Sequence, residues 1–299
     1  MKKNKKQKLQ KIIVILGPTA AGKSDLAVKL AKKFNGEIVS ADSRQVYKKM
    51  DIGTGKITKK EMNNIPHYLL DIVSPKRRFS VSQYQKLAIN ALNKILKKEK
   101  LPFLVGGSPF YIYSIIEGWK FPKLKPDWKE RKKLDKNTAS ELFKILKKLA
   151  KNRAKNIDKF NKRRLIRAIE IAKILGKVPK IKKCCQFNCL LIGIKKEPEV
   201  LKKLIEKRLK NRLKKGMVEE VKKLHKNGIS WKRLEDFGLE YRWIARFLQE
   251  KISQKEMIEL LQKDIEHFAK KQMTWFKRDK KIEWVKNYRE AENIVKTFH

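Results

Sequence analysis

Apolar and polar residues alternate along the first 120 residues in blocks that predict strands and helices in turn. Ile12–Leu16 is a short continuous apolar run, typical of a strand buried on both faces. The next block has apolar residues at helical spacing and ends at Asn35-Gly36. A short strand at 37–40, a helix that begins after Ser80 and a strand at 101–105 continue the series. We therefore expect an α/β fold, with a parallel sheet flanked by helices.

The pattern changes between residues 121 and 185, where the chain is basic and its apolar residues keep helical spacing. Prolines mark the start of this segment, and a glycine and a proline mark its end. We expect an inserted all-helical subdomain at 121–185, and an α/β core built from 1–120 and 186–299. Three isoleucines are expected in the core of one of its helices: Ile166, Ile169 and Ile174.

After the insertion, Cys189–Ile194 is predicted to return to the sheet as a strand. From residue 199 onward the chain is mostly helical. One helix carries Arg208 and Arg212 one turn apart, beside an apolar stripe. The last strong helix is predicted to begin after Ser253, which has capping-box spacing with a glutamate.

The charge is far from balanced, with 77 Lys and Arg against 31 Asp and Glu, a net charge of +46 and a pI near 10.2. So positive a field attracts polyanions, and nucleic acid is the expected partner. Much of the excess is lysine, which nucleotide bias in a genome can also produce. No apolar stretch approaches the roughly 20 residues needed to span a bilayer, so no membrane association is expected.

The N-terminal residues and the cysteines indicate where in the cell the protein is expected. The basic start, Met1–Lys6, lacks a cleavage site and leads into the first strand, so we expect no signal peptide. Cys184, Cys185 and Cys189 lack C-x-x-C spacing and a neighbouring histidine. We interpret them as reduced thiols of a cytoplasmic protein. We also expect a monomer.

The sequence GPTAAGKS follows the first strand and precedes the first helix, the context in which a G-x-x-x-x-G-K-[ST] loop binds phosphate. Its backbone N–H groups and the helix N-terminus would hold phosphate oxygens, with Lys23 as a point charge and Ser24 as a Mg²⁺ ligand. Together with the alternation above, it predicts a sheet like that of P-loop NTPases. The loop residues are Gly17, Pro18, Thr19, Ala20, Ala21, Gly22, Lys23 and Ser24.

The usual second part of a nucleotide-hydrolysis site, a strand that ends in Asp, is not evident. The strand at 101–105 runs into Gly106-Gly107, and Tyr68–Asp71 is only a weak candidate. Asp42, at the end of the strand at 37–40, is the best candidate for a reacting carboxylate. It could act as a general base or ligate Mg²⁺ through water, or it could simply cap a turn with Ser43.

Taken in order, several segments together resemble the tRNA dimethylallyltransferases, the isopentenyl-tRNA or IPP transferase family. The resemblance spans nearly the whole chain. The matching segments are GPTAAGKS, Ser40–Tyr47, Gly53–Lys56, Pro66–Ile72, Gly106–Ser108 with Tyr111, Arg163–Glu170, Gly216-Met217 with Glu219–Val221, Gly238–Tyr241, and Ala269–Gln272 with Trp275-Phe276.

The resemblance implies transfer of a dimethylallyl group from dimethylallyl diphosphate to the N6 amine of the adenosine 3′ of the anticodon in tRNA. The loop would then bind a diphosphate leaving group, so no Asp-ended strand is required. Lys23, with Mg²⁺ on Ser24, would neutralise the leaving group, and Asp42 would take the amine proton. Arg208 is implied as a further diphosphate contact, although it could equally lie on the solvated face of a basic helix.

The resemblance also implies contacts with the anticodon stem-loop, whose target base must be turned out to be reached. The implied residues are Asp42, Ser43, Arg44, Gln45, Ser108, Arg163, Arg164, Leu165, Ile166, Arg167, Phe237, Gly238, Tyr241 and Arg242. This chain departs from the family pattern at Pro109, at 238–241 and at Lys271. We expect Trp231 and Trp243 to pack rather than to stack on bases.

Three other functions share some of these features. A small-molecule kinase would use the same loop with ATP, but would not need a basic helical insertion. A P-loop protein that only binds RNA would need no carboxylate at position 42. An enzyme that prenylates free adenine nucleotides would dispense with the insertion.

Overall fold

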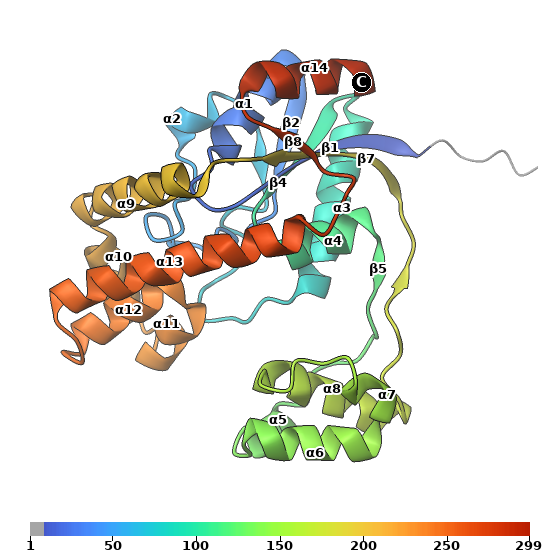
Figure 1. Ribbon diagram of the computed structural model, residues 1–299, viewed down its shortest axis with the longest axis vertical. Helices are drawn as coiled ribbons and strands as arrows, with labels where there is room; N and C mark the ends of the chain where they lie inside the picture. Colours follow the sequence, from blue (N-terminus) through green and yellow to red (C-terminus); the bar gives the residue numbers. More distant parts are fainter. Residues whose placement is uncertain (1–8) are drawn as a thin grey trace, which may run out of the picture. The chain divides into compact units, whose positions relative to one another are not determined.

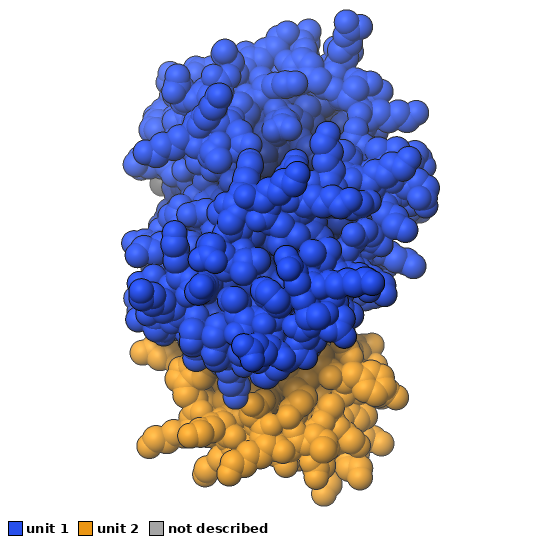
Figure 2. Space-filling model, turned by 90° about the vertical axis from the view of Figure 1, so that its left-hand side faces the viewer, with its two compact units in different colours: residues 1–118, 185–299 blue, residues 119–184 orange. Residues whose placement is uncertain are grey.

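The computed structural model describes residues 9–299, and the Met1–Lys6 stretch considered above lies outside them. The chain divides into two compact units (Figure 2). Unit 1 contains the described residues up to Gly118 and those from Cys185 to His299. Unit 2 is Trp119–Cys184, compared with the 121–185 expected from the sequence.

Unit 1 is built on a six-stranded sheet in which all paired strands are parallel, with the order β3-β2-β4-β1-β7-β8. This confirms the expected α/β class. Strand β1 lies inside the sheet, and its Ile12–Leu16 run is fully buried. The strands are β1 Gln10–Leu16, β2 Gly36–Ser40, β3 His67–Tyr68, β4 Leu101–Gly106, β7 Phe187–Ile194 and β8 Glu283–Val285.

Helices flank this sheet (Figure 1). Helices α1 and α14 share one hydrophobic core with Ile13 and Ile15, so they cover the same face of the sheet. Helix α3 begins with the expected capping box at Ser80 and packs against β2 and β4. The helices are α1 Lys23–Lys33, α2 Lys59–Met62, α3 Val81–Lys97, α4 Pro109–Ile116, α9 Pro198–Lys214, α10 Met217–Lys226, α11 Trp231–Phe237, α12 Leu239–Leu248, α13 Gln254–Phe276 and α14 Tyr288–Phe298.

The C-terminal end holds two elements that the apolar pattern did not predict. Helix α13 has the expected capping box at Ser253, but the chain continues into β8 and α14. Three residues of β8 are too few to show a strand period, because alternation needs about four to eight positions. Among the described residues, no helix is both long and apolar enough to cross a bilayer.

Unit 2 is helical except for a short antiparallel pair, so the expectation of an all-helical insertion needs this correction. Helices α5 Trp128–Leu134, α6 Ala139–Leu149, α7 Lys151–Ala154 and α8 Lys162–Leu175 surround its core. Strands β5 Trp119–Lys120 and β6 Lys182–Lys183 pair where the chain enters and leaves.

One of the three core positions predicted for unit 2 is wrong. Ile166 and Ile169 are buried, but Ile174 is 58% exposed. The burial of this helix ends at Ala172, and Ile174 lies in the exposed last turn just before Gly176.

Candidate active site

The phosphate loop leaves β1 with a backbone that few residues can adopt. Gly17 has φ 146° and Gly22 has φ 88°, and a Cβ at Gly17 would lie 3.1 Å from the Ile194 carbonyl oxygen. Gly22 precedes α1 and supplies no side-chain cap to it. The first N–H groups of α1 are therefore not capped from within the chain at this position, as anion binding at a helix N-terminus requires.

A cavity of about 300 Å³ lies over this loop. Its cations come from two distant parts of the chain, Lys23 in the loop and Arg208 in α9. Its other polar lining includes Thr19, Ser24, Asp42, Gln45, Thr54, Glu61 and Gln272. The predicted phosphate loop thus faces a polar space that holds two cations, Lys23 and Arg208, and three carboxylates, Asp25, Asp42 and Glu61.

Lys23 lines this cavity, is half-buried, and donates a 2.6 Å hydrogen bond to the Pro18 carbonyl oxygen. Burial, and next the positive charge of Arg208, lower the pKa of Lys23 from its ordinary value to about 8, although Asp42 opposes the shift. An anion in the cavity would offset both causes and favour the charged ammonium.

Arg208 faces the phosphate loop and is not on a solvated helix face. Its guanidinium donates to Thr19 Oγ1 at 3.4 Å and to the Gly55 carbonyl oxygen at 3.3 Å. A Cβ at Gly55, where φ is 58°, would lie 2.0 Å from Arg208 Nη2. The positive φ therefore favours glycine, and a Cβ at this position would displace the Arg208 guanidinium. The alternative of a merely solvated Arg208 is thereby excluded.

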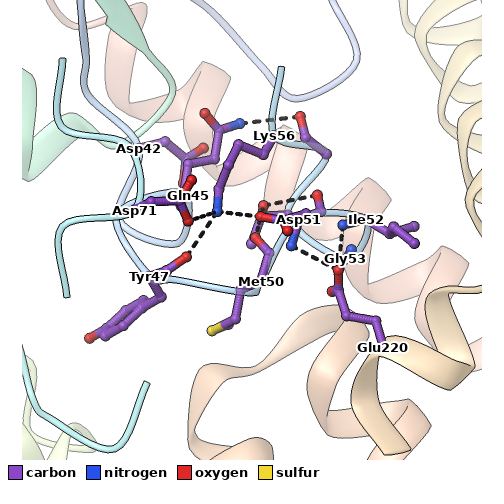
Figure 3. Close-up of polar contacts among 12 residues, drawn as sticks. Asp42, Gln45, Tyr47, Met50, Asp51, Ile52, Gly53, Lys56, Asp71 and Glu220 are labelled. Carbon is purple, nitrogen blue, oxygen red and sulfur yellow. Dashed lines mark hydrogen bonds and ion pairs between the residues drawn. The ribbon is translucent and has the colours of Figure 1, made fainter. Parts of the chain in front are cut away.

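The segment around Gly53–Lys56 is held from two sides (Figure 3). The Glu220 carboxylate accepts the N–H groups of Asp51, Ile52 and Gly53 at 2.6–3.0 Å. The Lys56 ammonium, which is 5% exposed, donates to the Tyr47 carbonyl oxygen and to the carboxylates of Asp51 and Asp71. Neither side chain was predicted as part of a site, although both lie in matching motifs. Both act by fixing this loop.

Asp42 lies at the carboxyl end of β2 and lines two cavities, the one over the phosphate loop and a neighbouring one. Its Oδ1 accepts the N–H of Arg44 at 2.8 Å and that of Gln45 at 3.3 Å. The turn-capping interpretation is thus correct for one carboxylate oxygen, and the same carboxyl group still reaches the cavities.

Ser108 fixes the turn that carries Asp42. Its Oγ accepts the N–H of Ser43 at 3.0 Å, so it does not cap α4. Pro109, the departure noted in the sequence, occupies the first turn of α4, where a missing N–H has no cost. The substitution is therefore accommodated without loss of the serine contact.

The neighbouring cavity, of about 280 Å³, is lined by the Asp42–Arg44 turn and by residues of α11–α13. Arg242 lines it and pairs with Asp264, and a nearby lining residue is His267. Trp243 donates to Asp264 at 3.0 Å, in accord with a packing role, and Trp231 stacks on His225.

Two residues implied to contact tRNA are buried at this cavity and act through others. Phe237 is 2% exposed, with the Arg233 guanidinium 4.3 Å from its ring centroid, and its carbonyl oxygen accepts from Arg44 Nε at 2.8 Å. Tyr241 is 1% exposed and donates to Glu220 at 2.8 Å. The Phe237 carbonyl oxygen therefore positions Arg44, and the Tyr241 hydroxyl positions the Glu220 carboxylate.

The structure also identifies a residue whose role the sequence did not predict. Gln272 of α13 is 4% exposed. Its Oε1 accepts the N–H of Thr19 at 2.9 Å, and its Nε2 donates to the Gly107 carbonyl oxygen at 2.6 Å. A Cβ at Gly107 would lie 2.4 Å from this Nε2. The Ala269–Gln272 motif signalled this position, but no local pattern could pair it with a residue 253 positions away.

In unit 2, the helix α8 presents only part of its implied RNA-contacting set. Leu165 and Ile166 are buried in the core of the unit, so their side chains cannot reach a partner. Arg167 donates to Glu170 and to the Leu124 carbonyl oxygen. Arg163 and Arg164 are the exposed members of the set.

The site can be compared with known proteins. Residues 45–279 match the family described as IPP transferase. The chain is 40% identical over 283 residues to the tRNA dimethylallyltransferase of Halothermothrix orenii, covering 91% of this chain and 86% of that one. It is 39% identical to that of Pelotomaculum thermopropionicum, covering 98% and 95%.

A solved structure is similar over the same length. The tRNA isopentenylpyrophosphate transferase of Bacillus halodurans superposes with a TM-score of 0.74 at 33% identity, covering 97% of this chain and 95% of that one. The phosphate loop, the glycine-rich loop beside Arg208 and the Asp42 turn are the parts of this chain that the family resemblance led us to expect. The chain belongs to the IPP transferase family.

Proposed function

We propose that this protein transfers a dimethylallyl group from dimethylallyl diphosphate to the N6 amine of the adenosine 3′-adjacent to the anticodon in tRNA, releasing diphosphate. One observation carries the proposal: Asp42 lines both the phosphate-loop cavity and the neighbouring cavity. A carboxylate so placed adjoins a diphosphate donor in one cavity and an acceptor base in the other. Relatives at about 40% identity with matching names support the assignment.

The diphosphate half of the reaction falls to the loop Gly17–Ser24, Lys23 and Arg208. As the carbon–oxygen bond breaks, negative charge grows on the departing diphosphate. Lys23, Arg208 and the backbone N–H groups of the loop stabilise that charge in a buried setting, where such interactions are stronger than in water.

The acceptor half depends on Asp42. An adenine amine is a poor nucleophile because its lone pair is delocalised into the ring. Asp42 accepts a proton from this amine as the nitrogen bonds to the allylic carbon, which carries positive charge after the diphosphate leaves. The Arg44 and Gln45 N–H groups hold the carboxylate in place.

The oxygen donors here suit Mg²⁺, which prefers hydroxyl, carboxylate and phosphate oxygens. Ser24 would hold it together with the diphosphate. The described residues contain no group of three or more His, Cys, Asp or Glu that could hold a metal alone, so the ligand would complete the site. The ion would neutralise charge on the leaving group.

Partners follow from the same proposal. tRNA is the acceptor, and the basic composition favours it. That the protein acts as a monomer stays a prediction. The cysteines are free thiols in the structure, as expected for a cytoplasmic protein, and that location stays a prediction.

The test is to supply dimethylallyl diphosphate labelled in the prenyl group with either tRNA or AMP, with and without ATP. We expect label in tRNA, release of one diphosphate for each transfer, and no requirement for ATP. Label in AMP but not in tRNA would assign a free-nucleotide prenyltransferase. Stoichiometric consumption of ATP would assign a kinase.

A further inference from the structure

Unit 2 carries an aromatic side chain that projects from a fixed turn. Phe160 is 78% exposed, the most exposed of the large apolar side chains in the described part of the chain. Asp158 Oδ1 accepts the Phe160 N–H at 3.1 Å, and the Asp158 carbonyl oxygen accepts the Asn161 N–H at 3.2 Å. Asn161 in turn caps α8 by accepting the Arg164 N–H. The backbone on both sides of Phe160 is thus held in one conformation.

Such a side chain contributes nothing to the core of its unit. The Lys159 ammonium lies 5.2 Å from the ring centroid, which leaves most of the ring accessible. A cation near a phenylalanine ring is favourable, and a rigid aromatic surface loses little conformational entropy when it binds. The ring is therefore arranged for contact with a flat partner.

Charge selects the kind of partner. Residues 119–184 contain 24 Lys and Arg against 6 Asp and Glu, and the exposed Arg163 and Arg164 lie three and four positions after Phe160. A polyanion is attracted by such a field, and the bases of a single strand offer flat faces that a duplex hides. Aromatic residues beside a basic track are how proteins bind unpaired nucleotides.

We propose that Phe160 stacks on an unpaired base of the RNA substrate while the neighbouring arginines contact its phosphates. The inference rests on the proposed function, because it takes tRNA as the substrate. It adds a contact outside both cavities, at a residue that is not among those the family resemblance implied.

The test compares dissociation constants of the full-length protein for an anticodon stem-loop RNA over a range of salt concentrations. We expect Phe160→Ala to weaken binding by about 5- to 150-fold, the range measured for base–aromatic stacking. The slope against log salt should not change, because no charge is lost. Arg163→Ala should instead reduce that slope by about one. At saturating RNA, the Phe160→Ala turnover should equal that of the wild type.

Matched variants separate stacking from other effects. Phe160→Trp should bind as tightly as the wild type, whereas Phe160→Leu should behave like alanine because it keeps apolar area but has no π face. Ile174→Ala removes another exposed apolar side chain from the same unit, in helix α8, and should leave affinity unchanged. The thermal unfolding midpoint should be the same for all of these variants.

Wild-type affinity for the RNA in Phe160→Ala, or in Phe160→Leu, would overturn the contact. So would a Phe160→Ala variant that binds the RNA normally but binds anionic lipid vesicles more weakly, which would assign a membrane surface instead. The wild-type transfer assay is read first. A wild type that transfers no label to tRNA refutes the proposed function, whereas a wild type that transfers label while Phe160→Ala binds normally refutes only the stacking contact.

Discussion

The Gln272 side-chain amide accepts the backbone N–H of Thr19 and, through its other end, donates to the Gly107 carbonyl oxygen. A helix close to the C-terminal end of the chain thereby joins the phosphate loop to the turn after β4. Both backbone groups belong to residues that line the phosphate-loop cavity, so the position of the loop depends on this amide.

Gln272→Ala should leave two backbone groups without partners in a buried place. We expect a loss of about 1–3 kcal/mol in the free energy of unfolding, and a higher KM for dimethylallyl diphosphate. Denaturant titration and steady-state kinetics measure the two effects. Gln272→Glu is the control, because it keeps the acceptor for Thr19 and loses only the donor to Gly107. An unchanged KM in Gln272→Ala would show that the loop holds its position unaided.

Asp42→Asn should abolish most turnover while binding persists. The asparagine oxygen can still accept the Arg44 and Gln45 N–H groups, so the turn is kept, but the amide cannot take a proton. We expect kcat to fall by about 10²–10⁴-fold. Isothermal titration with dimethylallyl diphosphate should give an affinity close to that of the wild type. Near-normal turnover in this variant would remove Asp42 from the chemistry.

Diphosphate affinity should fall as pH rises through about 8, the pKa of Lys23. The folded-state pKa lies below its ordinary value, so the ammonium is charged below about pH 8 and loses its proton above it. A bound diphosphate favours the charged form, so binding at pH 8–9 should take up protons. Calorimetry in two buffers of different ionisation enthalpy measures that uptake. Lys23→Met should remove this proton uptake. A pH profile of diphosphate affinity in that variant identical to that of the wild type would show that Lys23 is not the titrating group.

Gly55→Ala should displace Arg208, because the new Cβ would lie 2.0 Å from its Nη2. We expect a raised KM for dimethylallyl diphosphate together with lower stability. Gly176→Ala is the matched control: its φ of 69° gives a similar backbone cost, but a Cβ there meets nothing within 4 Å. That variant should lose about 1 kcal/mol of stability and keep its KM. Equal KM values in the two variants would mean that Arg208 does not contact the diphosphate.

The sequence alone determined the features that are local in the chain. The apolar run Ile12–Leu16, the loop Gly17–Ser24 and the capping boxes at Ser80 and Ser253 depend on residues a few positions apart. Backbone sterics, helix capping and side-chain period act over that range, so their patterns are written in consecutive residues. The order of motifs also indicated the family.

Only the tertiary structure decided which side chains meet across long sequence separations. It brought Arg208 to Thr19, Gln272 to Gly107 and Glu220 to the Gly53 loop, and it buried Leu165, Ile166 and Phe237 although they stood in the expected contact set. Ile174, which the sequence placed in the core, is exposed because no other element among the described residues packs over it in the tertiary structure. Contacts of this kind depend on how whole helices and strands pack. The burial of a side chain and its hydrogen bonds depend on all the residues around it, and most of these are far away in the sequence.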